Sequence, residues 1–106
     1  MASALINVPA KAKRGDIIEI KTLISHVMET GFRHDTTGKV FPRNIITNFV
    51  CTYNGEQIFG ADLFPAIAAN PFISFFTVAT ESGTIGFEWN GDNGFHETAS
   101  AAITVE

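Results

Sequence analysis

The chain has 106 residues, 45% of them hydrophobic, and a net charge of −4. This predicts one globular domain over residues 1–106, with apolar runs too short to cross a membrane. All seven Lys and Arg lie in residues 1–44, which carry net +3, whereas residues 45–106 carry net −7. Seven dispersed bases are weak support for a nucleic-acid interface. The polarised charge fits docking with a charged protein, or else an ordinary solvated surface.

The amino-terminal part of the chain contains two strand patterns. Residues 5–8 are apolar and end at Pro9, which predicts a short edge strand because proline donates no ladder hydrogen bond. Residues 11–16 read as a polar turn. Residues 17–25 then alternate between a buried face and a solvated face. The buried face is expected to hold Ile18, Ile20, Thr22 and Ile24, and the solvated face Glu19 and Lys21.

Residues 26–44 form a long segment between two strand patterns. Loops between strands usually have two to five residues, and longer ones are more often functional or disordered. Phe32, Val40 and Phe41 argue against a disordered linker. The sequence therefore predicts an ordered, partly apolar excursion from the edge of the domain.

The rest of the chain contains five further strand patterns and no convincing helix. They lie at residues 45–53, 57–62, 72–79, 84–90 and 98–105, and the Asn54-Gly55 hairpin signal separates the first two. With two strands before them, they make about seven short strands at regular spacing. This predicts an all-β fold, an immunoglobulin-like antiparallel β-sandwich.

Two of these strands are apolar on both faces, at residues 45–53 and 72–79. The first has Ile46 and Val50 opposite its main apolar face, and the second has Phe72, Phe76 and Val78 opposite Ile73, Phe75 and Ala79. A sandwich strand needs only one core face. The second face is either covered locally, by the long loop or by residues 63–71, or forms a protein–protein interface.

The residues give no direct sign of catalysis. His26, His34 and His96 have no metal-ligand spacing, and ordinary surface histidines explain them. Glu29 and Asp35 form a possible acid–base pair without a predicted pocket. Cys51 lies within a strand among Phe49, Val50 and Tyr53, where a buried structural thiol is expected. We therefore predict no catalytic residue, no metal site and no cofactor.

Several motifs resemble the sulphur-oxidation protein family SoxZ over residues 17–106. They are His26-Val-Met-Glu-Thr-Gly-Phe-Arg-His-Asp35, Pro42-Arg-Asn-Ile-Ile46, Phe49-Val-Cys-Thr-Tyr-Asn-Gly-Glu56 and Ala61-Asp-Leu-Phe-Pro-Ala-Ile-Ala-Ala-Asn-Pro71. Val27 departs from the family pattern, which has Pro there, and this should alter only the local turn. The resemblance implies an immunoglobulin-like fold and a heterodimer with SoxY, whose carboxy-terminal cysteine carries intermediates of thiosulphate oxidation.

In that role the chain is a non-catalytic scaffold. The amino-terminal stretch lacks a secretory signal pattern, and the resemblance implies a periplasmic protein that is exported together with SoxY. The two-faced strands supply the candidate anchors for SoxY, Phe49, Tyr53, Phe72 and Phe75. The long loop supplies Arg33, Lys39 and Arg43 as candidates for orienting the carrier or docking other Sox enzymes.

Two other classes of function stay open. One is a small immunoglobulin-like metal-binding redox domain that uses His26, His34 and His96, which metal analysis of the purified protein would distinguish. The other is an adaptor domain unrelated to sulphur, which would ignore a SoxY-like chain.

Overall fold

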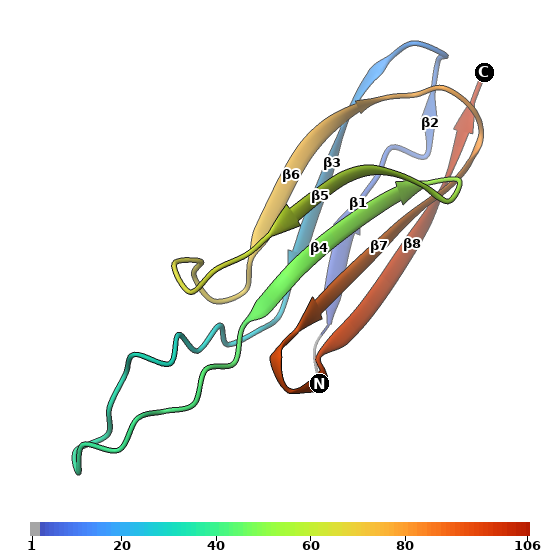
Figure 1. Ribbon diagram of the computed structural model, residues 1–106. Coiled ribbons are helices and arrows are strands. Elements are labelled where there is room, and N and C mark those ends of the chain that lie inside the picture. The colour runs from blue at the N-terminus through green and yellow to red at the C-terminus, as the bar shows by residue number, and fades with distance from the viewer. Residues whose placement is uncertain (1–2) are drawn as a thin grey trace.

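A computed structural model describes residues 3–106, and these residues form a two-layer β-sandwich (Figure 1). Met1 and Ala2, part of the stretch in which the sequence predicts no secretory signal, lie outside the described residues. The strands are β1 (Ala4–Asn7), β2 (Lys11–Ala12), β3 (Ile17–Ile24), β4 (Ile46–Tyr53), β5 (Glu56–Asp62), β6 (Phe72–Val78), β7 (Gly83–Gly91) and β8 (His96–Val105). Among residues 3–106 the one helical element is a short 3-10 turn, η1 (Asp92–Gly94), and no helix is long and apolar enough to cross a membrane.

The strands form one sheet of three and one sheet of five. The three-stranded sheet has the order β1-β3-β6, and the five-stranded sheet has the order β2-β8-β7-β4-β5. The pairs are antiparallel except β2 with β8, which is parallel. The predicted immunoglobulin-like sandwich is confirmed. The expected polar turn over residues 11–16 is wrong in part, because Lys11 and Ala12 extend the five-stranded sheet along the end of β8.

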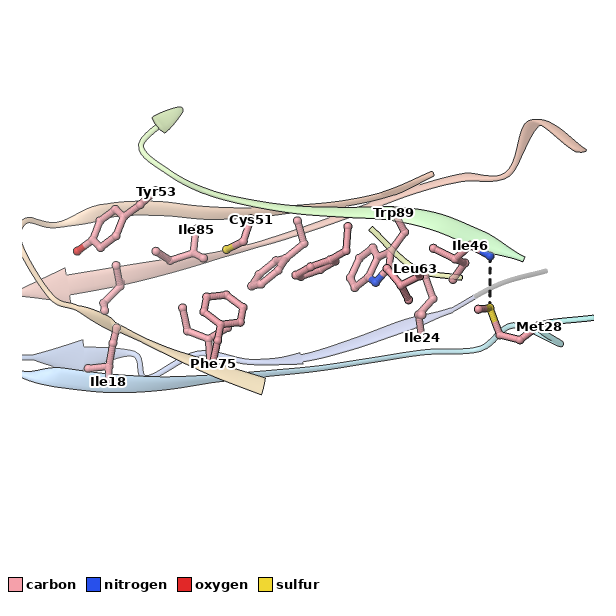
Figure 2. Packing of buried hydrophobic residues seen from close by; sticks show 14 of the residues in the cluster. Ile18, Ile24, Met28, Ile46, Cys51, Tyr53, Leu63, Phe75, Ile85 and Trp89 are labelled. Carbon is pink, nitrogen blue, oxygen red and sulfur yellow. Dashed lines mark hydrogen bonds between the residues drawn. The ribbon is translucent and has the colours of Figure 1, made fainter. Parts of the chain in front are cut away.

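The core lies between the two sheets and is rich in aromatic side chains (Figure 2). Phe49 stands at its centre, with ring centroids 5.3 Å from Trp89, 6.3 Å from Phe87 and 6.4 Å from Phe75. Phe59 of β5 stacks on Phe75 of β6 with centroids 4.3 Å apart, so this pair joins the two sheets. Such contacts stabilise a core beyond simple burial of area.

The two strands expected to be apolar on both faces behave differently. The outward face predicted for Ile46 is wrong, because a register shift between Ile46 and Asn48 turns the Ile46 side chain into the core. Met28 of the long loop and Leu63 of the 63–71 connection pack in the same cluster (Figure 2). With Ile46 turned inward, Val50 is the one apolar side chain left on the outer face of β4 and it is half-buried, whereas β6 keeps an exposed apolar second face.

Candidate partner interface

The outer face of the three-stranded sheet carries large apolar side chains that face water. Cross-strand pairing arranges its outward residues in four rows, which are Leu5–Leu23–Phe72, Asn7–Lys21–Ser74, Glu19–Phe76 and Ile17–Val78. Phe72 and Phe76 are 61% and 65% exposed, and Ile17 is 73% exposed. An apolar end therefore lies on each side of a charged middle, where Lys21 Nζ is 3.7 Å from Glu19 Oε1.

The outer face of the five-stranded sheet has a different composition. Its cross-strand rows are Gly60–Val50–Glu88–Thr98, Thr52–Gly86–Ser100 and Asn48–Asn90–His96. These side chains are small or polar, with half-buried Val50 as the single larger apolar member of those rows. Polar-outside alternation is what a solvated antiparallel sheet requires. The two outer faces thus differ in exposed apolar side chains: the three-stranded sheet carries several large ones, as a face covered by a partner does, and the five-stranded sheet does not.

Three of the four predicted partner anchors lie in the core. Phe49, Tyr53 and Phe75 are at most 8% exposed, because the inward face of β4 and of β6 is the face that carries them. Side chains inside the sandwich cannot contact a partner, so this part of the prediction is corrected. Phe72 lies on the outer face and stays a candidate. Sequence reasoning missed two other exposed apolar residues of this face, Ile17 and Leu23, which share the two-residue period of Glu19 and Lys21.

Tyr53 instead fastens one end of the sandwich. Its hydroxyl donates a hydrogen bond to the Glu81 carbonyl and accepts from the Thr80 and Glu81 amides, each at 3.3 Å. These bonds tie the end of β4 to the turn between β6 and β7. The Tyr53 hydroxyl therefore has a structural role, because it joins two segments of the fold.

The second candidate surface is the long loop (residues 26–44), which projects from one end of the sandwich (Figure 1). At its root, Glu29 and Asn44 exchange two backbone hydrogen bonds of 2.8 Å. Met28 anchors the root from inside, because its side chain is 5% exposed and its Sδ accepts the Ile46 amide at 3.3 Å (Figure 2). The predicted ordered excursion thus has a fixed base.

The tip of the long loop is held by a carboxylate and exposes apolar and basic groups. Asp35 Oδ1 accepts the Thr37 and Lys39 amides at 2.8 and 2.9 Å, which closes the turn. The hydrogen bond from the Thr37 hydroxyl, together with these two amides, lowers the pKa of Asp35. Phe32 is 75% exposed near the tip. Lys39 is in no ion pair of the described residues, so the long loop exposes an aromatic ring and, closer to its tip, an uncompensated cation.

The two arginines proposed for docking both have internal partners. Arg33 forms a bidentate pair with Glu29, with its Nη2 2.5 Å from Oε1, and its guanidinium lies 4.5 Å from the centroid of the Phe41 ring. Arg43 Nη2 donates to Asp92 Oδ1 at 2.8 Å. The Arg33 side chain stays 66% exposed, so one edge still faces solvent.

The possible acid–base pair does not form a shared site. Hydrogen bonding to Arg33 lowers the pKa of Glu29, and hydrogen bonding within the turn lowers that of Asp35. Both carboxylates are therefore held ionised, each by its own neighbours. A general acid at neutral pH needs the opposite shift.

The three histidines occupy separate environments. His26 Nδ1 accepts the Met28 amide at 3.0 Å, and its ring meets Phe95 edge to face at a centroid distance of 4.8 Å. His34 lies near the loop tip, and His96 Nδ1 is 2.7 Å from the Asn90 side-chain oxygen on β7. Within residues 3–106 no three or more metal-ligating side chains come together, so the metal-binding alternative finds no three-ligand set there.

Cys51 is fully buried on the inward face of β4. Burial raises the pKa of its thiol to about 12, because a thiolate loses its hydration in the core. A neutral, enclosed thiol is neither a nucleophile nor a carrier group. The sequence prediction of a buried structural thiol is confirmed.

Comparison of the sequence with known families identifies the family of this chain. The family model described as sulphur oxidation protein SoxZ matches residues 6–102. No curated protein matches the chain. Among solved structures, the sulphur carrier protein SoxY from Chlorobium limicola f thiosulfatophilum aligns with a TM-score of 0.66 and 14% identity, covering 97% of this chain and 78% of that one.

Other solved structures share the fold at similarly low identity. A superoxide reductase (neelaredoxin) from Ignicoccus hospitalis has a TM-score of 0.72 at 14% identity, covering 98% of this chain and 80% of that one. A CARDB domain from Pyrococcus furiosus has a TM-score of 0.60 at 12% identity, covering 100% and 88%. Likeness at this level is a likeness of fold. The family match spans nearly the whole chain, and this chain belongs to the SoxZ family.

Proposed function

We propose that this chain is a non-catalytic subunit of a sulphur-carrier heterodimer in thiosulphate oxidation. Its partner is a SoxY-like chain, whose carboxy-terminal cysteine carries the sulphur intermediates. Membership of the SoxZ family and the common fold with a sulphur carrier protein SoxY support this assignment. The chain supports and presents the carrier subunit and performs no reaction itself.

The burial of Cys51 is the main observation in favour of a non-carrying role for this chain, with the carrier cysteine on its partner. Covalent transport of sulphur needs a thiolate that other proteins can reach. Cys51 is the one cysteine of the 106 residues, it is 0% exposed, and burial raises its pKa to about 12. The carrier thiol therefore comes from another chain, and this chain contributes surface.

We further propose that the heterodimer works in the periplasm and that this subunit is exported together with its SoxY-like partner. The motif resemblance on residues 26–71 motivates this localisation. Fractionation of cells that express the chain with and without the partner tests it. Periplasmic recovery only with the partner is expected, and recovery in the cytoplasm under both conditions would contradict it.

Co-expression with the cognate SoxY-like chain tests the assembly. Gel filtration and intact mass should reveal a one-to-one complex in which the sulphur adduct sits on the partner. A monodisperse lone domain that ignores the partner would contradict the proposal and favour an adaptor unrelated to sulphur. Mass added to Cys51 in the native complex would contradict the non-carrying role.

A further inference from the structure

We propose that the outer face of the three-stranded sheet is the surface that packs against the SoxY-like partner. The inference rests on the proposed function, and it names the strands and side chains that make the contact. Its occupant is one sheet face of a second sandwich. The main observation behind this inference is the pairing of β1, β3 and β6. It brings apolar side chains from three separate parts of the chain onto one exposed sheet face.

The plane has two apolar ends. At one end Leu5, Leu23 and Phe72 stand side by side on three strands, and they are 67%, 37% and 61% exposed. At the other end Phe76 lies near the Ile17–Val78 pair. Cross-strand neighbours of this kind have side chains close enough to form one continuous surface. A partner therefore meets two hydrophobic patches, one on each side of the polar middle.

The exposed area is suited to a stable complex. The six apolar side chains expose on the order of 600 Å², at about 170 Å² for each complete large side chain. A typical stable interface uses about 800 Å² on each partner. The polar middle row adds the remaining area, so the face has the size that a heterodimer needs. Left uncovered, the same face is an aggregation risk.

The polar middle determines what chemistry the partner presents. Lys21 and Glu19 form an ion pair that is open to solvent, and Asn7 and Ser74 flank Lys21. Covering these groups without partners costs free energy, so the partner must supply hydrogen-bonding side chains at its centre and apolar side chains at both ends. Such a pattern fixes the register of docking as well as its strength.

The contact is sheet against sheet. The partner fold is itself a sandwich, and stacked sheets pack about 10 Å apart through side chains that stand out from each plane. Phe72 and Phe76 stand out in this way from β6. A second copy of this chain is a poorer occupant, because two molecules of net charge −4 repel each other. The long loop extends from the end of the sandwich and remains free for other contacts (Figure 1).

Two matched substitutions test the face without touching the core. Ser74 is an exposed residue halfway along β6, in the polar middle row of this face, and Ser100 is an exposed residue halfway along β8 on the opposite, polar face. Ser74→Arg places a bulky charge in the proposed contact, and Ser100→Arg places the same charge outside it. Titration calorimetry with the purified cognate SoxY-like chain should give at least about 30-fold weaker binding for Ser74→Arg only, as for loss of a dominant contact.

The aromatic end is tested in the same assay with Phe76→Ser, for which we also expect about 30-fold weaker binding. Equal affinities of wild type, Ser74→Arg and Ser100→Arg would overturn the assigned face while the heterodimer itself stands. No binding by the wild-type chain would overturn the proposed function as well. Self-association of the lone chain that Ser74→Arg abolishes would identify a second copy as the occupant and overturn the inference.

Discussion

The buried thiol of Cys51 links protonation to stability at the scale of a single residue. Its ordinary pKa is 9.0, and burial raises it to about 12 in the folded chain. Between these values the unfolded chain has lost the proton and the folded chain keeps it, so stability falls as pH rises. The free energy of unfolding should drop by about 1.4 kcal/mol more between pH 8 and pH 10 than it does in Cys51→Ala.

Urea denaturation at the two pH values, on wild type and variant, measures this difference. A disulfide-exchange reagent should also leave the native thiol unmodified and should react with it once the chain is unfolded. Parallel pH profiles for wild type and Cys51→Ala would contradict the raised pKa.

A substitution at Tyr53 tests whether this residue stabilises the core or contacts the partner. Tyr53→Phe removes the hydroxyl that links the Thr80–Glu81 turn to β4 and leaves the ring in place. We expect a loss of about 1–2 kcal/mol in the free energy of unfolding. Affinity for the SoxY-like partner should stay unchanged, because the ring lies inside the sandwich. Weaker binding at unchanged stability would restore Tyr53 as a partner anchor.

At the scale of elements, the root of the long loop is clamped to the turn after β7. Asp92 accepts hydrogen bonds from Arg43 at 2.8 Å and from the Ile45 amide at 3.1 Å. The Arg43 hydrogen bond is the main cause of the lowered pKa of Asp92, whose ordinary value is 3.8. The stability that this carboxylate contributes is therefore present above its ordinary pKa and is lost as pH falls through its folded pKa.

Arg43→Gln should make the fold more sensitive to acid. Without the guanidinium, the pKa of Asp92 moves back toward its ordinary value, so the contribution is lost at a higher pH. Near-ultraviolet circular dichroism between pH 2 and pH 5 should give a higher midpoint of acid unfolding for Arg43→Gln than for wild type. Lys39→Gln, at the tip of the same loop, is the matched control and should leave the midpoint unchanged.

The strand pattern was predictable from the sequence because each strand obeys a two-residue period. The inward sets on β3 and β7 are those that alternation predicts, down to Ile85, Phe87 and Trp89. The face assignment failed where local geometry breaks the period, as at the register shift that buries Ile46. Which apolar face of β4 and β6 points inward depends on the partner sheet, and a single strand pattern does not encode that choice.

The candidate site was harder to predict than the fold. Phe72 was identified because its strand is apolar on both faces. Leu5, Ile17 and Leu23 share their strand faces with the polar residues Asn7, Glu19 and Lys21. Only the pairing of β1, β3 and β6 gathers these apolar residues with Phe72. The charges of the long loop were visible in the sequence, whereas the pairing of Arg33 with Glu29 and of Arg43 with Asp92 required the folded chain.

At the scale of the whole molecule, the charge is polarised along the chain, and the bases gather at the two ends of the fold. Residues 45–106 carry net −7, and three of the seven bases lie in the long loop at one end of the sandwich. Three others, Lys11, Lys13 and Arg14, lie on and after β2, near the far end (Figure 1). The long loop also contains the acids Glu29 and Asp35, so residues 26–44 carry net +1. An exposed base such as Lys39 accelerates association with an oppositely charged surface, and salt screens this attraction. The long loop therefore suits transient docking, in contrast to the apolar outer face.

We predict that neutralising Arg33, Lys39 and Arg43 together lowers turnover and leaves the heterodimer intact. Thiosulphate-dependent turnover of the reconstituted carrier system should fall on the order of 10-fold at low ionic strength and by less at high salt. Exchange of Lys11, Lys13 and Arg14 for Gln changes the net charge equally and should have little effect, since these bases lie away from the long loop. Equal loss in both triple variants would indicate that net charge alone controls turnover. If Lys39→Gln alone lowers turnover as much as the triple variant does, the ammonium group of Lys39 makes the contact. The two arginines then serve only the structure of the loop.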